Sequence, residues 1–279
     1  TGEAPNQVTD DYGAVGGGYS NLAGDAAGPT NTHVFAAVGG GFDNAASGLL
    51  STVGGGSTNT ASGTQSAVGG GQGNTASGLN SIIGGGSGNF ASGQSATVGG
   101  GSDNTASGIG STAGGGSLNC AGGSYSWAGG FRAKVRPGLA PAGGVCAGLT
   151  YPGGSGDSGT FVWADSQSVD FVSTGPNQFL VRAAGGMAVN TNDPGSSSFR
   201  VNGTIRVDTL GTNSAGAPTL CRNAGNQIAL CSSSKRYKDD IADLPPSLDA
   251  VLALRPVSYN WKVTGAPDNA LMSCSRAAF

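Results

Sequence analysis

The sequence predicts an all-β protein built mainly as a parallel β-solenoid, in which each turn of the chain adds one rung to a stack. Two observations carry this prediction. Glycine supplies 54 of the 279 residues, far above its usual share of about 7%. A segment of 15 residues also repeats through the first half of the chain. Only 10% of the residues are charged and 6% aromatic, which argues against an ordinary globular enzyme with a single large core.

The repeat is marked by an aliphatic residue followed by glycines. The expected core positions are Val38, Val53, Val68, Ile83 and Val98. An asparagine follows each anchor by six residues, and this column is formed by Asn44, Asn59, Asn74, Asn89, Asn104 and Asn119. The step from Val15 to Val38 exceeds the period by eight residues, which predicts a loop around 26–33.

A rung of 15 residues is too short for a helical hairpin, and its glycine content disfavours helices. It suffices for two short strands and two tight turns, where glycine accepts a positive φ without a Cβ clash. Identical residues then stack from rung to rung, and the asparagine amides can form a ladder. Because the Ala/Val core is thin, one chain buries too little apolar surface to offset backbone ordering. We therefore expect association with other copies, as a homotrimer.

Three other interpretations of the repeat were weighed. Calcium-binding β-rolls use a nine-residue period with repeated aspartates, which this sequence lacks. An ice- or glycan-binding solenoid remains an alternative, but its ladder of Thr60, Thr75 and Thr105 is interrupted by Ala45 and Phe90. A shaft without a discrete site fits the repeat best. His33, the one histidine, is interpreted as a residue of the inserted loop.

From Val15 to Phe131 the period and its Ala, Ser and Gly positions resemble the YadA-like head of trimeric autotransporter adhesins. The resemblance implies a left-handed parallel β-roll in which three chains pack side by side. Residues 1–131 are accordingly taken as the head. The glycine triplet departs from that family, where a single glycine is more common.

The second domain is expected over 132–230, with a Pro/Gly-rich linker at 137–158. Strand-like runs at 159–164, 169–173 and 177–183 predict a β-meander or prism. This order resembles the shaft-to-tail segment of tail-fibre proteins, and it implies that Trp163 and Phe179 anchor the core of a trimeric prism.

The chain contains five cysteines, the first of which is Cys120. Cys221 and Cys231 flank an Asn-Ala-Gly-Asn turn, so we predict a hairpin closed by a disulfide between them. Cys120 is interpreted as a small buried residue of the repeat, and its pairing with Cys146 is left open, as is the state of Cys274. A disulfide would suit an oxidising, extracellular setting.

Residues 231–279 form the third expected domain, a small α+β remnant. The run from Ser232 to Ile241, an amphipathic helix at 246–254 and the segment Arg255–Lys262 resemble the start of the intramolecular chaperone domain behind endosialidases. That family helps a fibre to trimerise and then cleaves itself off. The resemblance implies that Ser233 is the nucleophile and Lys238 its general base. The family's later segment finds no match here, so we expect the chain to stay mostly uncleaved.

Charge and motifs exclude several function classes. Residues 1–131 contain no Lys or Arg, which rules out phosphate contacts with nucleic acid by this half. The glycine triplets are not phosphate loops, because no Gly-Lys-Ser/Thr follows. No membrane-spanning apolar run, cofactor motif or metal motif is found in the sequence.

The expected function is that of a structural and adhesive homotrimeric fibre. We expect this fibre to be extracellular, either at a cell surface, secreted or on a virion. A phage tail fibre that recognises a host, or a one-turnover Ser/Lys autoprotease, are the alternatives.

Overall fold

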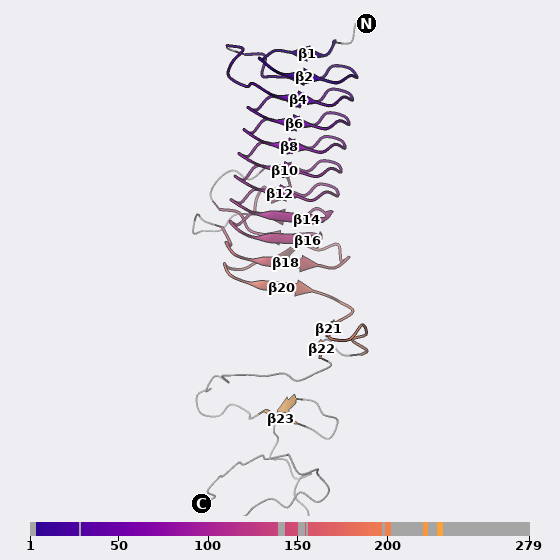
Figure 1. Ribbon diagram of the computed structural model, residues 1–279. Helices are drawn as coiled ribbons and strands as arrows, with labels where there is room; N and C mark the ends of the chain where they lie inside the picture. Colours follow the sequence, from indigo (N-terminus) through magenta and orange to yellow (C-terminus); the bar gives the residue numbers. More distant parts are fainter. Residues whose placement is uncertain are drawn as a thin grey trace, which may run out of the picture. The chain divides into compact units, whose positions relative to one another are not determined.

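The computed structural model describes residues 4–27, 29–138, 143–149, 154, 156–196, 199–201, 220–222 and 228–230. The chain divides into two units, Thr1–Ile205 and Arg206–Phe279. The first unit contains two ten-stranded parallel sheets that run along the same stack of rungs (Figure 1). The prediction of an all-β parallel solenoid is confirmed.

One sheet, here called sheet A, holds the odd-numbered strands. Its members are β1 (Gln7–Val8), β3 (Leu22–Ala23), β5 (Ala45–Ala46), β7 (Thr60–Ala61), β9 (Thr75–Ala76), β11 (Phe90–Ala91), β13 (Thr105–Ala106), β15 (Cys120–Ala121), β17 (Ala133–Val135) and β19 (Phe171–Val172).

The other sheet, sheet B, holds the even-numbered strands. Its members are β2 (Ala14–Val15), β4 (Ala37–Val38), β6 (Thr52–Val53), β8 (Ala67–Val68), β10 (Ile82–Ile83), β12 (Thr97–Val98), β14 (Thr112–Ser117), β16 (Trp127–Phe131), β18 (Phe161–Ala164) and β20 (Phe179–Arg182).

Small side chains fill the space between the two sheets. From β3 to β13 and in β15 the second residue of each two-residue strand points inward, so a column of Val and Ile in sheet B faces a column of Ala in sheet A. All five predicted core positions are at most 2% exposed; they are Val38, Val53, Val68, Ile83 and Val98. The narrow interior explains why alanine rather than leucine or phenylalanine dominates the repeat.

The glycine triplets make a turn that other residues cannot make. Gly56, the third glycine of its triplet, has φ of +92°, and a Cβ atom there would overlap the carbonyl oxygen of Gly71 on the next rung. Gly63, at the opposite turn, meets Gly78 in the same way. Neighbouring rungs therefore stack backbone on backbone at the turns, and this close approach selects glycine.

Parallel stacking continues past Phe131. Trp127 pairs with Phe161, and Phe161 pairs with Phe179, so β18 and β20 extend sheet B, while β19 extends sheet A. The prediction of a β-meander or prism is therefore wrong over β18 to β20. The rungs persist although the 15-residue spacing does not, because extra residues are accommodated in the connections between strands.

Four further strands complete the described elements. β21 (Met187–Val189) and β22 (Phe199–Val201) pair in parallel. In the second unit, β23 (Leu220–Arg222) and β24 (Ile228–Leu230) pair antiparallel, as the predicted hairpin requires. One 3₁₀ turn, η1 (Gly144–Cys146), lies in the connection between β17 and β18. Within the described ranges, no helix is long and apolar enough to span a bilayer.

Candidate functional site

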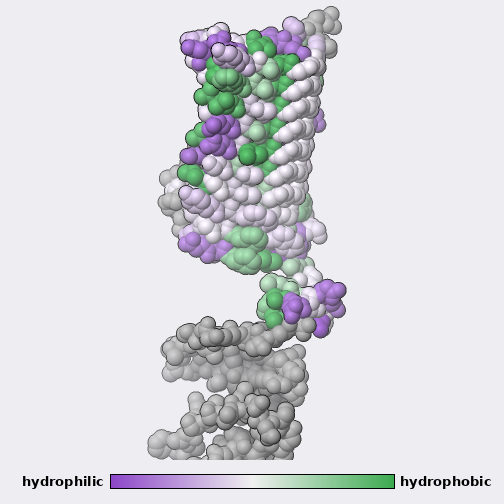
Figure 2. Space-filling view, in the orientation of Figure 1, coloured by the Kyte–Doolittle hydropathy of each residue, from purple (hydrophilic) through white to green (hydrophobic). Residues whose placement is uncertain are grey.

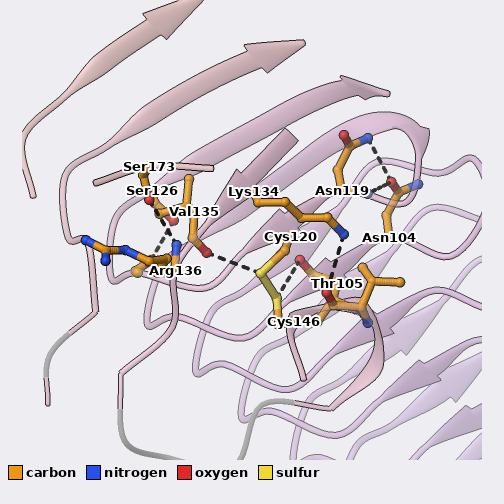
Figure 3. Close-up of a disulfide and its surroundings, with 12 residues drawn as sticks. Asn104, Thr105, Asn119, Cys120, Ser126, Lys134, Val135, Arg136, Cys146 and Ser173 are labelled. Atoms are coloured by element: carbon orange, nitrogen blue, oxygen red, sulfur yellow. Dashed lines mark hydrogen bonds between the residues drawn. A yellow bond between two sulfur atoms is a disulfide. The ribbon is translucent and has the colours of Figure 1, made fainter. Parts of the chain in front are cut away.

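A continuous column of asparagine side chains runs inside the solenoid. Asn44, Asn59, Asn74, Asn89, Asn104 and Asn119 are each at most 1% exposed. Each Nδ2 donates to Oδ1 of the asparagine one rung before it, for example from Asn74 to Asn59 at 3.0 Å. The same Nδ2 groups also donate to carbonyl oxygens of the glycine triplets, such as Gly70 at 3.0 Å. Figure 3 shows one step of the column, from Asn119 to Asn104 at 2.9 Å.

Both ends of the column are capped by hydrogen bonds. Asn21 extends the column by one rung, because Asn44 Nδ2 donates to its Oδ1 at 3.0 Å. Asn6 Oδ1 then accepts from the backbone N–H and from Nδ2 of Asn21, each at 3.0 Å. At the other end, the backbone N–H of Ala133 donates to Asn119 Oδ1 at 2.9 Å. Sequence reasoning missed Asn6, although it lies one period before Asn21, because no glycine triplet precedes it. Capping leaves neither end of the buried ladder with an unpaired amide.

A disulfide fixes part of the β17–β18 connection to the outer face of sheet A. Cys120 on β15 and Cys146 of η1 form a disulfide with a Cα–Cα distance of 5.2 Å (Figure 3). The backbone N–H of Val145 donates to Thr105 Oγ1 at 3.1 Å. The pairing that the sequence left open is therefore formed. Cys120 is fully buried, as expected, but as half of a disulfide.

A lysine that is almost fully buried lies beneath the disulfide-bonded segment. Lys134 is 4% exposed, and its Nζ donates to the carbonyl oxygen of Val145 at 3.4 Å (Figure 3). Burial lowers the pKa of its amine below the ordinary value, nearby Asp170 opposes this, and Arg132 adds to it. The register places Lys134 beside Cys120 on the outward side of sheet A. Segment 143–149 therefore covers a column that would otherwise face solvent.

Cys146→Ser is expected to uncover Lys134. Loss of the disulfide lowers stability by about 3 kcal/mol in the chain-entropy model and releases segment 143–149. Acylation of the Lys134 amine, followed by peptide mass spectrometry, should accelerate at least tenfold. Ala147→Ser, at an exposed position of the same segment, is the control and should leave the rate unchanged. An equal rate in both variants would show that the disulfide does not hold the cover.

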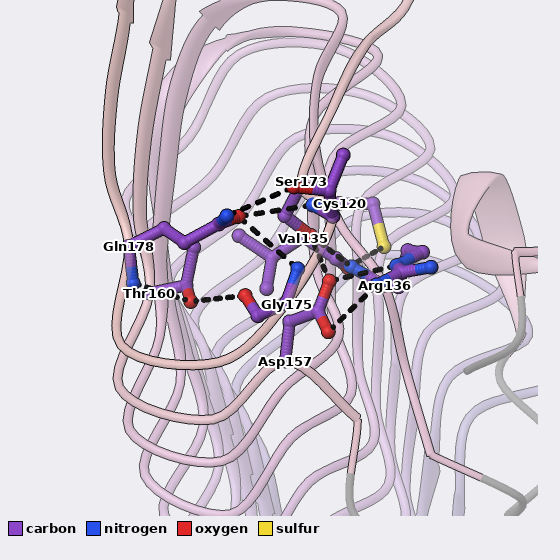
Figure 4. A network of polar contacts seen from close by, with 9 residues as sticks. Cys120, Val135, Arg136, Asp157, Thr160, Ser173, Gly175 and Gln178 are labelled. Atoms are coloured by element: carbon purple, nitrogen blue, oxygen red, sulfur yellow. Dashed lines mark hydrogen bonds and ion pairs between the residues drawn. The ribbon is translucent and has the colours of Figure 1, made fainter. Parts of the chain in front are cut away.

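An ion pair fastens the two ends of the β17–β18 connection to each other. Arg136 directly follows β17, and it donates from Nε and Nη2 to the carboxylate of Asp157, at 2.8 and 3.1 Å (Figure 4). Asp157 is fully buried and also accepts from Ser173 Oγ. A bidentate Arg–carboxylate pair fixes geometry better than a single contact. The network closes the base of the insertion where the chain leaves and re-enters the stack.

A hydrogen-bonded turn supports the same end of the solenoid. Gln178 Oε1 accepts from the backbone N–H of Thr174 at 2.9 Å and of Gly175 at 3.2 Å (Figure 4). Thr160 Oγ1 donates to the carbonyl oxygen of Gly175 at 3.2 Å. These bonds define the turn between β19 and β20, which corresponds to the Ser-Gly turn of the regular rungs.

Asp165 and Arg182 connect the last two strands of sheet B. Arg182 Nε donates to Asp165 Oδ1 at 2.9 Å, and the backbone N–H of Ala184 donates to Oδ2 at 2.7 Å. The bond from Ala184 is the largest cause that lowers the pKa of Asp165; burial, the next largest, raises it, and the hydrogen bonds from Arg182 and Gln167 lower it further, to about 2. The carboxylate therefore stays ionised down to strongly acidic pH.

Aromatic rings stack along the outward side of sheet B. The centroids of Trp127 and Phe161 lie 4.5 Å apart, and those of Phe161 and Phe179 lie 4.8 Å apart, with nearly parallel planes. Phe179 is 69% exposed and Trp163 is 37% exposed. In the single chain these two residues therefore lie on the surface and not in a core. Their predicted role as anchors between three chains stays a prediction.

His33 lies in the inserted loop between β3 and β4, as interpreted from the sequence. Its Nδ1 is 2.9 Å from Asp25 Oδ2, and Asp10 Oδ2 accepts from the backbone N–H of Asp25 at 2.9 Å. The three side chains offer ligand atoms within 4.8 Å of one another. These contacts hold the inserted loop against the first rungs, which gives all three side chains a structural role.

The C-terminal candidates lie outside the described residues. They are Ser233, Lys238 and Cys231. The β23–β24 register pairs Cys221 with Ala229, and the Cys221–Cys231 disulfide stays a prediction. The helix expected at 246–254 also falls outside the described ranges.

One comparison with known proteins bears on this C-terminal segment. Residues 233–271 match the model of a protein family described as chaperone of endosialidase. No curated protein matches the chain. The matched segment is a small part of the 279 residues and follows the β-solenoid in the sequence. It begins at Ser233 and includes Lys238. In the sequence, a segment similar to this chaperone family therefore follows a parallel β-solenoid.

Proposed function

We propose that this protein is a structural subunit of an extracellular, homotrimeric fibre of the tail-fibre type, and that residues 233–271 assist its assembly. The observation that carries the proposal is the order of parts in the chain: a β-solenoid first, and then a segment matching the chaperone of endosialidase. Glycine loses more conformational freedom on folding than any other residue, and it supplies 54 of the 279 residues, so assistance in ordering and assembling the chains is useful.

The solenoid has the physical properties of a shaft. Its rungs are joined by backbone bonds along both sheets and by the buried asparagine column. The side chains on its outer faces repeat from rung to rung, which suits many weak, simultaneous contacts with a host or matrix surface. The Cys120–Cys146 disulfide supports an extracellular setting, where disulfides persist. The adhesive role and the choice between virion and cell surface are part of the proposal.

Self-cleavage is a second candidate function, favoured by the start of the family match at Ser233. The chemistry requires Lys238 to act as a base, which a lysine does only when its surroundings lower its pKa. The reaction would open the Ser232–Ser233 peptide bond. Ser233→Ala and Lys238→Ala would remove it, whereas Ser234→Ala would not. From the sequence we expect the chain to stay mostly uncleaved.

Three chains compared side by side test the assembly role: the full chain, its Ser233→Ala variant and a chain that ends at Leu230. Equal amounts are refolded from denaturant, and the trimer yield is measured by sedimentation velocity. The first two should give equal yields, and the third at least tenfold less. Intact-mass spectrometry of the full chain reports cleavage in the same samples. Equal trimer yields from all three chains would contradict the assembly role.

A further inference from the structure

The solenoid presents four sides, the two sheets and two rows of turns, and they differ in what they can pack against. The row of turns that leads from sheet A to sheet B exposes the apolar residues Leu50, Leu79 and Ile109. Exposed polar residues alternate with them on the same side, namely Gln65, Asn80 and Gln94. This row therefore offers no continuous apolar column.

The outward column of sheet A is covered over part of its length. Thr105 and Cys120 are at most 1% exposed and Lys134 is 4% exposed, because the disulfide-fastened segment 143–149 lies over them. A second chain cannot pack flat against sheet A along the whole stack while this segment is in place.

The side formed by the glycine turns is charged. Isolated parallel bridges run along it from Tyr19 to Ser117. Asp43 and Asp103 lie exposed beside these bridges. When identical chains pack in parallel around a common axis, the same residue of each chain lies at the same level. These carboxylates would then face their own copies, and like charges at an interface cost several kcal/mol.

Sheet B differs from the other three sides. Its outward column contains no charged residue over ten strands: Ala14, Ala37, Thr52, Ala67, Ile82, Thr97, Thr112, Trp127, Phe161 and Phe179. Ile82 is 48% exposed and Phe179 is 69% exposed, so no described segment covers this column. In Figure 2, which has the orientation of Figure 1, a green patch lies at the lower end of this face, at the level of β18 and β20.

Glycine keeps the face flat next to this column. Trp127 lies over Gly114 and Gly129, and a Cβ atom at Gly114 would come within 3.0 Å of the indole ring. Across the regular rungs the first glycine of each triplet, for example Gly69 or Gly84, is exposed. Small residues and glycine let two backbones approach closely, as a side-by-side packing of rods requires.

We propose that the outward column of sheet B is the surface on which the chain packs against two other copies of itself, in parallel and in register. This inference rests on the proposed trimer and assigns its interface. Ten strands spaced by about 4.8 Å form a strip about 45 Å long. With a width of about 10 Å toward each neighbour, each contact buries roughly 450 Å² per chain, so a chain needs both neighbours to bury about the ~800 Å² that one partner buries in a standard stable interface.

Two matched cysteine variants test the assignment. Thr97→Cys lies on β12 of sheet B and Thr75→Cys on β9 of sheet A; both replace a half-buried threonine at the first position of a two-residue strand. The background carries Ser at Cys221, Cys231 and Cys274 in the full chain. After treatment with a short bismaleimide, Thr97→Cys should give at least ten times more covalent dimer than Thr75→Cys.

The sedimenting mass of each variant shows whether a failed prediction concerns the interface on sheet B or the trimer itself. A trimer in which Thr75→Cys cross-links as well as or better than Thr97→Cys overturns the assignment to sheet B and leaves the trimer intact. A chain that sediments as a monomer and yields no covalent dimer with either cysteine contradicts the trimer itself, and the interface with it.

Discussion

Replacing Asn74 with leucine is expected to lower the free energy of unfolding by about 4 kcal/mol or more. Leucine has the same branching at Cγ as asparagine but bulkier terminal groups, so the change removes hydrogen bonds without leaving a cavity. Asn74 Nδ2 donates to Asn59 Oδ1 and to Gly70 and Gly86 carbonyl oxygens. Asn74 Oδ1 accepts from the backbone N–H and Nδ2 of Asn89, each at 3.0 Å. The Asn59 and Asn89 groups are buried and would each lose a partner at a cost of about 1–3 kcal/mol, whereas the two glycine carbonyl groups are only partly buried and lose less.

Asn80→Leu is the control within the same rung. Asn80 is exposed with φ of +57°, and Leu50 takes the same place two rungs earlier with the same φ. The structure therefore already accepts leucine there, and the expected change is within about 0.5 kcal/mol. Urea denaturation followed by circular dichroism gives both values. Equal midpoints for the two variants would mean that the asparagine column contributes little to stability.

Gly71→Ala should destabilise the chain by about 3 kcal/mol or more, because two penalties coincide. Gly71 has φ of +94°, a conformation that alanine adopts only under strain. A methyl group there would also overlap the carbonyl oxygen of Gly86 on the next rung and lie 2.9 Å from Asn74 Nδ2. The backbone cannot move away without separating two rungs of the solenoid.

Gly73→Ala isolates the first of these penalties. Gly73 also has a positive φ, of +65°, but its nearest neighbour to an added Cβ atom is Thr58 Oγ1 at 4.0 Å. Thr58 and Asp103 hold the equivalent position in other rungs with a positive φ. Thermal melting of both variants should place Gly73→Ala within about 1 kcal/mol of the wild type. A larger loss for Gly73→Ala than for Gly71→Ala would refute close rung contact as the reason for the triplet.

The regular part of the fold could be predicted from the sequence because its physics is local and repeated. Val53, Asn59 and Gly63 each recur at one spacing, and a period of 15 with so much glycine leaves few alternatives to stacked strands. The inward positions follow directly from the repeat, as the burial of Val53 and Asn59 shows. The glycine triplet is explained only by the structure, because its cause is contact between rungs.

The later rungs could not be predicted in this way. The insertion after Val135 separates Trp127 from its partner Phe161, and β18 to β20 lack the glycine triplets, so the sequence loses its period while the sheets continue. Irregular alternation was then interpreted as a meander. The Cys120–Cys146 pair was equally hidden, because the proximity of these residues depends on how the insertion folds back over sheet A.

The C-terminal segment was accessible to sequence reasoning for the opposite reason. This segment is identified by a motif that occurs once, Ser-Ser-Ser-Lys-Arg-Tyr-Lys, and residues 233–271 match the model of a chaperone family. The roles of Ser233 and Lys238 depend on packing that a motif does not specify, since a base needs a desolvated amine. These roles therefore stay predictions.

The mass of the assembled protein tests the trimeric fibre most directly. Sedimentation equilibrium of the full chain, at protein concentrations from micromolar upward and in the absence of reductant, should give a single species of about 81 kDa, three times the 26.9 kDa of one chain. The mass should not fall on dilution over the accessible range. A well-folded species of 26.9 kDa at every concentration would contradict the trimer.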